Sequence, residues 1–165
     1  MKAMVVYDSQ FGNTGQIAQA IGRGLDVTAG SPDKIDVRQV AEVGPDALAS
    51  LDVLVVGSPT QKFRPTSDTK TFLKNIPKGA LKGVRVAAFD TRLTEEEVNS
   101  NGVLSKLVGI FGYAAQPISD SLAKKGGDVV MPPEGFYVTG TEGPLVEGEL
   151  ERAAAWGRQI AGQRL

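Results

Sequence analysis

Residues 3–14 read Ala3-Met4-Val5-Val6-Tyr7-Asp8-Ser9-Gln10-Phe11-Gly12-Asn13-Thr14, and this stretch decides the fold. Its first five residues form a continuous apolar run, which is typical of a strand buried on both faces of a parallel sheet. The polar residues that follow include Gly12 and predict a loop. Thr14 is a good N-cap residue for a helix, and the spacing of Ile17, Ile21 and Leu25 predicts one apolar helical face. We therefore expect a buried strand, a polar loop and a helix in that order.

The same alternation continues along the chain. Further strands are expected at residues 35–40, 53–56, 84–89 and 128–139, the last of them interrupted at Pro132-Pro133. Helices are expected at residues 45–51, 67–76, 103–111, 114–125 and 146–160, with loops at Gly30-Ser31-Pro32 and over the charged residues 90–101. Strands alternating with helices predict an α/β fold, a three-layer αβα sandwich around a five-stranded parallel sheet. The doubly wound strand orders open to such a sheet include 2-1-3-4-5, and the pattern alone does not choose among them.

Composition restricts the chemistry of the chain. Its 165 residues suit a single domain over residues 1–165, and the net charge of −1 provides no general attraction to nucleic acid or membranes. There is no Cys and no His, which excludes disulfides, thiol nucleophiles, zinc clusters and imidazole acid–base chemistry. The first apolar run is too short for a signal peptide, and no stretch approaches the roughly 20 apolar residues of a membrane span. We expect a cytoplasmic protein whose chemistry comes from carboxylates, hydroxyls, Lys, Arg or a bound cofactor.

Three loops should meet where such a sheet binds its ligands, beyond the carboxyl ends of the strands at the point where strand order reverses. They are Asp8–Asn13, Ser58–Thr66 and the segment from Asp90 onward. The first loop has the chemistry of an anion site, because it offers polar side chains and Gly12 and leads into the positive end of a helix dipole. An ordinary polar strand–helix turn explains the same residues equally well. A P-loop, a G-x-G-x-x-G fingerprint after the first strand and a G-x-S-x-G elbow are all absent from the sequence.

The loop over residues 7–14 resembles the phosphate loop of the flavodoxin family, a hydroxyl residue followed by Gly-Asn-Thr at the start of the first helix. Residues 55–60, Val-Val-Gly-Ser-Pro-Thr, resemble the second flavin loop of that family. The resemblance implies the 2-1-3-4-5 order and the cofactor flavin mononucleotide (FMN). It places around the FMN phosphate Ser9, Gln10, Gly12, Asn13 and Thr14. It places along the ribityl chain and ring edge Pro59, Thr60, Gln61 and Lys62.

Aromatic and third-loop residues fit the resemblance less closely. Phe11 stands where short-chain carriers usually have Thr, although an aromatic residue there is similar to the flavodoxin domains of flavodiiron proteins. Phe63 is the aromatic candidate for contact with the isoalloxazine ring, or else a loop anchor packed on the rim of the sheet. The family commonly stacks an aromatic residue from the third loop on the flavin, but this chain has Asp90-Thr91-Arg92-Leu93 there. Backbone groups of Asp90, Thr91 and Arg92 could still bond the flavin edge, with Arg92 over or beside the ring, or the segment is a plain strand-end turn.

Several other residues could contribute to such a site or to the surface around it. The position of Trp156 in the apolar stripe of the last helix indicates core packing rather than flavin contact. A cation near the flavin, from Lys62, Arg64 or Arg92, would favour the anionic reduced ring and raise its potential. The lysines around the helix at 67–76 suit a solvated face. For residues 94–113 the sequence leaves three alternatives open: a cap over the flavin, a docking surface for a partner, or a plain excursion over the helix layer.

The function most consistent with these features is electron transfer by an FMN-dependent carrier, because a bound flavin needs no acid, base or nucleophile from the chain. A stand-alone oxidoreductase, an NAD(P)H-dependent quinone reductase, is the less favoured alternative. A flavin-free domain with a binding or regulatory role is a third. For the carrier we expect a redox partner protein, no nucleic acid or membrane partner, and a monomer or weak oligomer.

Overall fold

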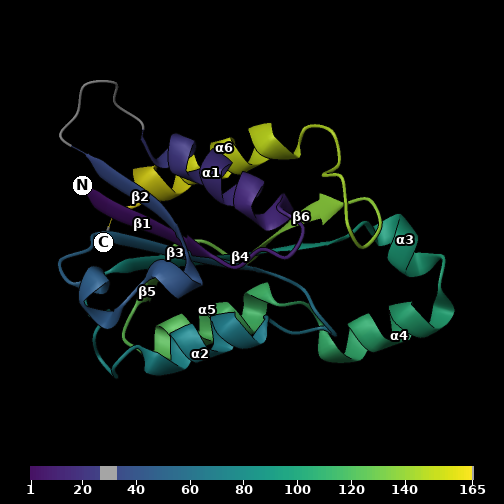
Figure 1. The fold of residues 1–165 in the computed structure, drawn as a ribbon, viewed down its shortest axis with the longest axis horizontal. Helices are drawn as coiled ribbons and strands as arrows, with labels where there is room; N and C mark the ends of the chain where they lie inside the picture. Colours follow the sequence, from purple (N-terminus) through teal and green to yellow (C-terminus); the bar gives the residue numbers. More distant parts are fainter. Residues whose placement is uncertain (27–32, 165) are drawn as a thin grey trace.

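The computed structural model describes residues 1–26 and 33–164, so the predicted Gly30-Ser31-Pro32 loop lies outside the described residues. One parallel sheet forms the centre, with strand order β2-β1-β3-β4-β5 (Figure 1). Its strands are β1 (Lys2–Tyr7), β2 (Lys34–Gln39), β3 (Val53–Pro59), β4 (Arg85–Leu93), β5 (Asp128–Val129) and β6 (Glu134–Val138). Both β5 and β6 pair with β4 in parallel. In the sequence, β5 precedes Pro132-Pro133 and β6 follows them. The predicted order and the predicted interruption of the last strand are confirmed.

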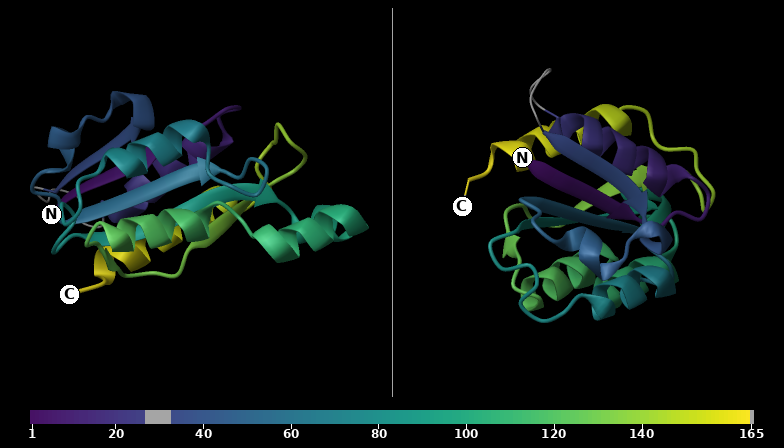
Figure 2. Two further views of the ribbon diagram at one scale, coloured as in Figure 1. Left: turned by 90° about the horizontal axis from the view of Figure 1, so that it is seen from below. Right: turned by 60° about the vertical axis from the view of Figure 1, so that its left-hand side comes forward.

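Helices cover both faces of the sheet and extend past one of its ends (Figures 1 and 2). One face carries α1 (Asn13–Leu25) and α6 (Glu149–Gly162), and the other carries α2 (Ser67–Asn75) and α5 (Ala115–Lys124). Two short 3₁₀ helices, Val40–Glu42 and Pro45–Leu48, follow β2. The remaining pair, α3 (Glu95–Asn99) and α4 (Gly102–Phe111), lies beyond the carboxyl end of β4. Among the described residues, no helix is both long and apolar enough to cross a lipid bilayer.

Two apolar clusters form the core, one on each face of the sheet. Alternate residues of β3 supply them: Val53 and Val55 pack with α1 and α6, and Leu54 and Val56 pack with α2 and α5. Trp156 lies 4% exposed on α6, where its ring meets the rings of Phe89 and Phe136 edge-on, at centroid distances of 6.4 and 6.0 Å. The core packing predicted for this tryptophan is confirmed.

Close contact between α1 and α6 depends on two glycines. A Cβ atom at Gly24 would lie 2.1 Å from the carbonyl oxygen of Ala154, and one at Gly157 would lie 2.4 Å from that of Ile21. No side chain fits at these distances, so the two backbones approach each other directly. This close packing against α6 holds α1 in position, and with it the loop that precedes α1.

The prediction of a loop over residues 90–101 is wrong at two places, where the structure has a strand and a helix. Strand β4 continues to Leu93, because β6 pairs with it from Phe89 to Leu93 and satisfies its backbone groups. Helix α3 then begins after Thr94, whose hydroxyl accepts the Glu97 N–H at 3.2 Å while the Glu97 carboxylate accepts the Thr94 N–H at 3.3 Å. This Thr-x-x-Glu capping box is visible in the sequence and could have predicted the helix.

Candidate functional site

A hollow of about 160 Å³ opens at the carboxyl edge of the sheet, between the loop after β1 and the ends of β3, β4 and β6. Nine of the predicted site residues line it: Gln10, Phe11, Asn13, Thr14, Pro59, Thr60, Gln61, Thr91 and Arg92. Sequence reasoning missed four further lining residues, Leu93, Val138, Gly140 and Thr141. Three of these belong to β6 or to the segment after it. The rule that selected the first three loops applies equally to the end of the last strand, and it could have found them.

The other five predicted residues lie around the hollow. Ser9 and Gly12 line an adjoining groove along α1. Phe63 lines a separate groove beside α2, next to Lys62 in the same turn. Asp90 is fully buried within β4 and does not line the hollow.

The N-terminus of α1 is built by Gly12 and Ser9. Gly12 is the N-cap residue with a φ of +90°, a left-handed conformation that favours glycine. The Ser9 hydroxyl oxygen accepts the N–H groups of Gly12 at 3.0 Å and Gly15 at 3.4 Å. The N–H groups of Asn13 and Thr14 open the helix and have no acceptor within it. Four backbone donors therefore gather at the positive end of the α1 dipole.

The predicted N-cap role of Thr14 is wrong. The N-cap is Gly12 and helix α1 begins at Asn13, two residues earlier than a Thr14 cap implies, because Gly12 adopts a left-handed conformation and Ser9 supplies the capping oxygen from the loop. Thr14 is buried instead, and its hydroxyl lies 2.8 Å from the hydroxyl of Thr91 on β4. This pair joins the start of α1 to the wall of the hollow.

Side-chain amides connect the loops around the hollow. The Asn13 amide donates to the carbonyl oxygen of Glu142 at 2.9 Å, which ties α1 to the segment after β6. The Gln61 amide donates to the side-chain oxygen of Gln10, which joins the first loop to the second. These two bonds hold together loops that are far apart in sequence.

A tight turn at Gln61–Arg64 shapes the second loop. The backbones of Gln61 and Arg64 exchange hydrogen bonds of 2.8 and 2.9 Å. Between them Lys62 and Phe63 have φ values of +46° and +67°, which are strained for residues with a side chain. The turn leaves Gln61 in the hollow and places the Phe63 ring outside it, stacked on Phe111 at a centroid distance of 5.9 Å.

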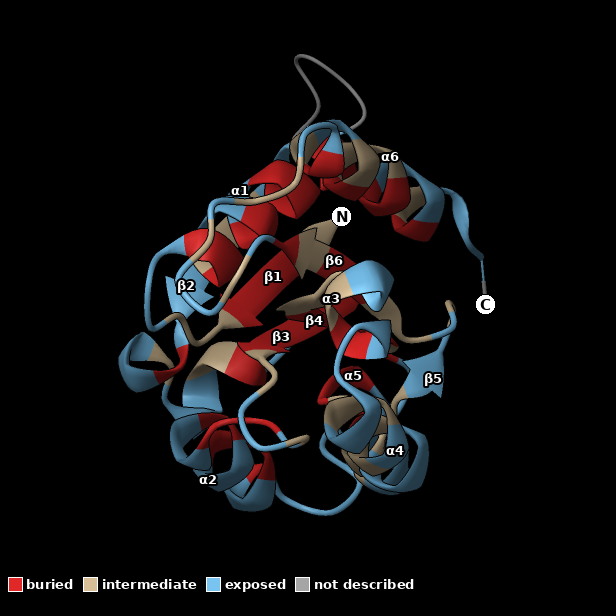
Figure 3. Ribbon diagram, turned by 90° about the vertical axis from the view of Figure 1, so that its right-hand side faces the viewer, coloured by how far each residue is buried: buried red, intermediate tan, exposed pale blue. Residues whose placement is uncertain are grey.

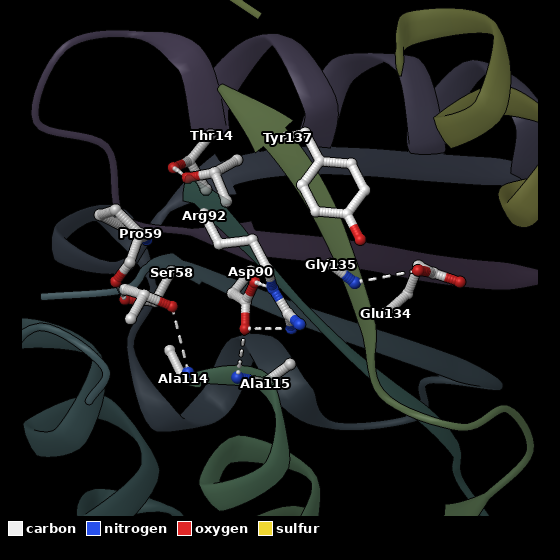
Figure 4. Close-up of polar contacts among 12 residues, drawn as sticks. Thr14, Ser58, Pro59, Asp90, Arg92, Ala114, Ala115, Glu134, Gly135 and Tyr137 are labelled. Atoms are coloured by element: carbon white, nitrogen blue, oxygen red, sulfur yellow. Dashed lines mark hydrogen bonds and ion pairs between the residues drawn. The ribbon is translucent and has the colours of Figure 1, made fainter. Parts of the chain in front are cut away.

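The only charged side chain among the described residues that line the hollow is Arg92. Its Nε and Nη2 atoms donate to the two carboxylate oxygens of Asp90 at 2.6 and 2.8 Å, and the Ala115 N–H at the start of α5 donates to Asp90 Oδ2 at 2.9 Å (Figure 4). Burial raises the pKa of Asp90 above its ordinary value, although Arg92 acts to lower it. The Tyr113 ring lies against the guanidinium, 3.7 Å from its carbon atom to the ring centroid. The Asp90 carboxylate thus offsets part of the positive charge that Arg92 adds to the wall of the hollow.

The sheet is doubly wound and parallel, and its polar loops and an open helix N-terminus meet at the strand-order reversal, the place where α/β proteins of this kind bind ligands. The chain matches the model of the flavodoxin family over residues 5–156, and it belongs to that family. It is 28% identical to a flavodoxin from Picosynechococcus sp., over 96% of this chain and 95% of that protein.

Solved structures agree on the fold. An archaeal flavodoxin superposes with a TM-score of 0.75 at 24% identity, covering 98% of this chain and 96% of the other. Oxidised flavodoxin 1 from Bacillus cereus superposes with a TM-score of 0.74 at 17% identity, covering 100% of both chains.

Proposed function

We propose that this chain binds FMN in the hollow and acts in electron transfer. The observation that carries the proposal is the set of backbone donors at the start of α1, beside the hollow and at the strand-order reversal. Flavin binding by members of the flavodoxin family supports the choice of ligand.

The residues present fit a phosphate group. The N–H groups of Gly12, Asn13, Thr14 and Gly15 face the end of α1 where a helix dipole favours an anion. The Ser9 hydroxyl now accepts two of these N–H groups, and it can instead donate to a phosphate oxygen. Phosphate would thus be held by amides and a hydroxyl, without an ion pair.

The remaining lining residues fit the rest of the cofactor. Pro59, Thr60 and Gln61 come from the end of β3, and Thr91 and Arg92 from the end of β4, so both loops border the space beside the anion site. FMN supplies one- and two-electron redox chemistry when bound. Arg92 adds positive charge at the wall, which favours the reduced, more negative ring, and Asp90 limits that effect. Lys62 and Arg64, also considered from the sequence, do not line the hollow.

The visible absorption spectrum of the purified protein, before and after addition of FMN, tests the proposal. We expect a shifted flavin spectrum and quenched FMN fluorescence. Substitution Ser9→Ala should weaken FMN binding about tenfold, the loss of a hydrogen bond of about 1.4 kcal/mol to a charged group. It should leave riboflavin binding unchanged, since riboflavin has no phosphate, and Ser67→Ala at the exposed start of α2 is the matched control.

Two results would count against the proposal. A protein that neither carries flavin nor changes the spectrum of added FMN would refute flavin binding. Steady-state oxidation of NADPH with a quinone by the FMN-loaded chain alone would assign it to the reductases instead of the carriers.

A further inference from the structure

Helix α4 is an apolar helix without a partner. It projects from the body of the molecule (Figure 2), and none of its residues is buried (Figure 3). Val103, Ile110 and Phe111 are 71%, 64% and 53% exposed. Exposed apolar surface of this kind typically marks a protein interaction site, since its burial against a partner is favourable.

A groove of about 460 Å³ continues this apolar surface toward the body, between α2, α5 and the C-terminal end of α4. Phe63 and Phe111 form its aromatic wall, stacked with an interplanar angle of 26°. Pro117 of α5 lies along the groove, and the cationic side chains that line it are Arg64, Lys70 and Lys74. Among the described residues, no carboxylate lines this groove.

Among the described residues, these cations have no internal counter-ion. In the part of the chain that the structure describes, Arg64, Lys70 and Lys74 form no ion pair, and neither do the neighbouring exposed cations Lys62 and Lys106.

Acids on the two helices that flank the groove have other contacts. Asp68 on α2 lines a different groove, together with Thr71 and Asn75. The Asp120 carboxylate on α5 accepts a hydrogen bond from Gln116 at 2.9 Å. The positive field of the groove is therefore local, in a chain whose net charge is only −1.

We propose that α4 and this groove, together the docking surface, bind a small acidic redox protein whose carboxylates surround an apolar patch. Charge complementarity selects the acidic partner. A second copy of this chain in a symmetric dimer would place the same cations opposite each other. Only the redox character of the partner rests on the proposed function.

The docking surface adjoins the hollow through one turn. Gln61 lines the hollow, while Phe63 and Arg64, two and three residues later, line the groove. Just beyond the same, C-terminal end of α4, the Ala114 N–H donates to the Thr60 hydroxyl at 3.1 Å, beside the hollow. A protein seated on α4 and the groove therefore lies next to the candidate FMN site.

Isothermal titration calorimetry with a plant-type [2Fe–2S] ferredoxin as the acidic probe tests the proposal. We expect saturable binding at low salt that weakens as salt rises. The double substitution Lys70→Glu/Lys74→Glu should weaken binding by about tenfold or more. The control Lys78→Glu/Lys82→Glu changes the net charge equally at exposed positions outside the groove, and it should have a much smaller effect.

The apolar part is tested by Phe111→Ala, which should weaken binding, against Val129→Ala, an exposed apolar residue of the edge strand β5 that does not line the groove, which should not. Equal effects of the two charge variants, unchanged binding by Phe111→Ala, or no saturable binding would each overturn the proposal. So would a stable dimer that buries α4 in sedimentation experiments. Titrations repeated on flavin-free protein should give the same affinity, so a failure of FMN binding and a failure of docking are separate results.

Discussion

The buried pair of Asp90 and Arg92 gives a prediction that can be worked out in detail. The Asp90 carboxylate is fully buried and accepts three hydrogen bonds, two from Arg92 and one from the Ala115 N–H. In Asp90→Asn the side chain keeps one acceptor oxygen and turns an amide donor toward the guanidinium. Arg92, 17% exposed, is left as a cation without its counter-ion.

Removal of one partner from a buried ion pair costs about 3–5 kcal/mol of unfolding free energy. In a protein of this length that corresponds to a fall in Tm of roughly 6–20 °C. The second substitution Arg92→Met removes the stranded cation, so Asp90→Asn/Arg92→Met should be more stable than the sum of the single changes predicts, by about 1 kcal/mol or more.

Urea unfolding, followed by circular dichroism and by the fluorescence of the single Trp156, measures all four proteins of the cycle. Asp128→Asn, at an exposed carboxylate of β5, is the control and should change stability by less than about 0.5 kcal/mol. Additive single changes, or a loss below about 1 kcal/mol for Asp90→Asn, would refute the reasoning that the pair is coupled and buried.

Three further predictions concern packing, backbone strain and pH. Gly157→Ala should destabilise by roughly 1–3 kcal/mol in thermal unfolding, since its Cβ would lie 2.4 Å from a carbonyl oxygen of α1, whereas Gly162→Ala, with open space around it, should not. Lys62→Gly should stabilise by about 1 kcal/mol, because its φ of +46° is strained for a side chain; a lower midpoint in urea would contradict this. The Gly140 N–H, at 2.9 Å, lowers the pKa of Glu97, so this contact is present above the ordinary pKa of a glutamate and is lost as pH falls through the lowered value. The Gly140 amide signal in NMR spectra should follow that titration and should not titrate in Glu97→Gln.

Much of the fold could be predicted from the sequence because its signals are local and repeated. Buried strands show as continuous apolar runs, and helices α2, α4 and α5 lie within one or two residues of their predicted bounds. The prolines at 132 and 133 marked the break between β5 and β6 correctly, since proline cannot donate to the ladder.

The predictions failed where a polar side chain is satisfied by a distant partner. Asp90 looked like a loop residue, yet its charge is balanced inside the sheet by Arg92 and the start of α5. Thr14 looked like a cap, yet it faces Thr91, 77 residues away. For Phe63 the sequence left two roles open, contact with the flavin or a loop anchor at the rim of the sheet, and the left-handed turn places its ring outside the hollow, on Phe111. Such pairings depend on tertiary packing that no local pattern contains.

Two of the helices that start at this edge of the sheet, α1 and α5, differ in the group that meets their first N–H donors. At α5 the chain supplies an anion of its own, because the Asp90 carboxylate already accepts the Ala115 N–H. At α1 only a neutral hydroxyl, that of Ser9, occupies the corresponding place, and it can turn to donate. The start of α1 can therefore accept the phosphate of a ligand, whereas the start of α5 is already occupied by Asp90. Under the proposed function, the phosphate end of the mononucleotide lies at α1, and the start of α5 is closed to a second phosphate because Asp90 already occupies it.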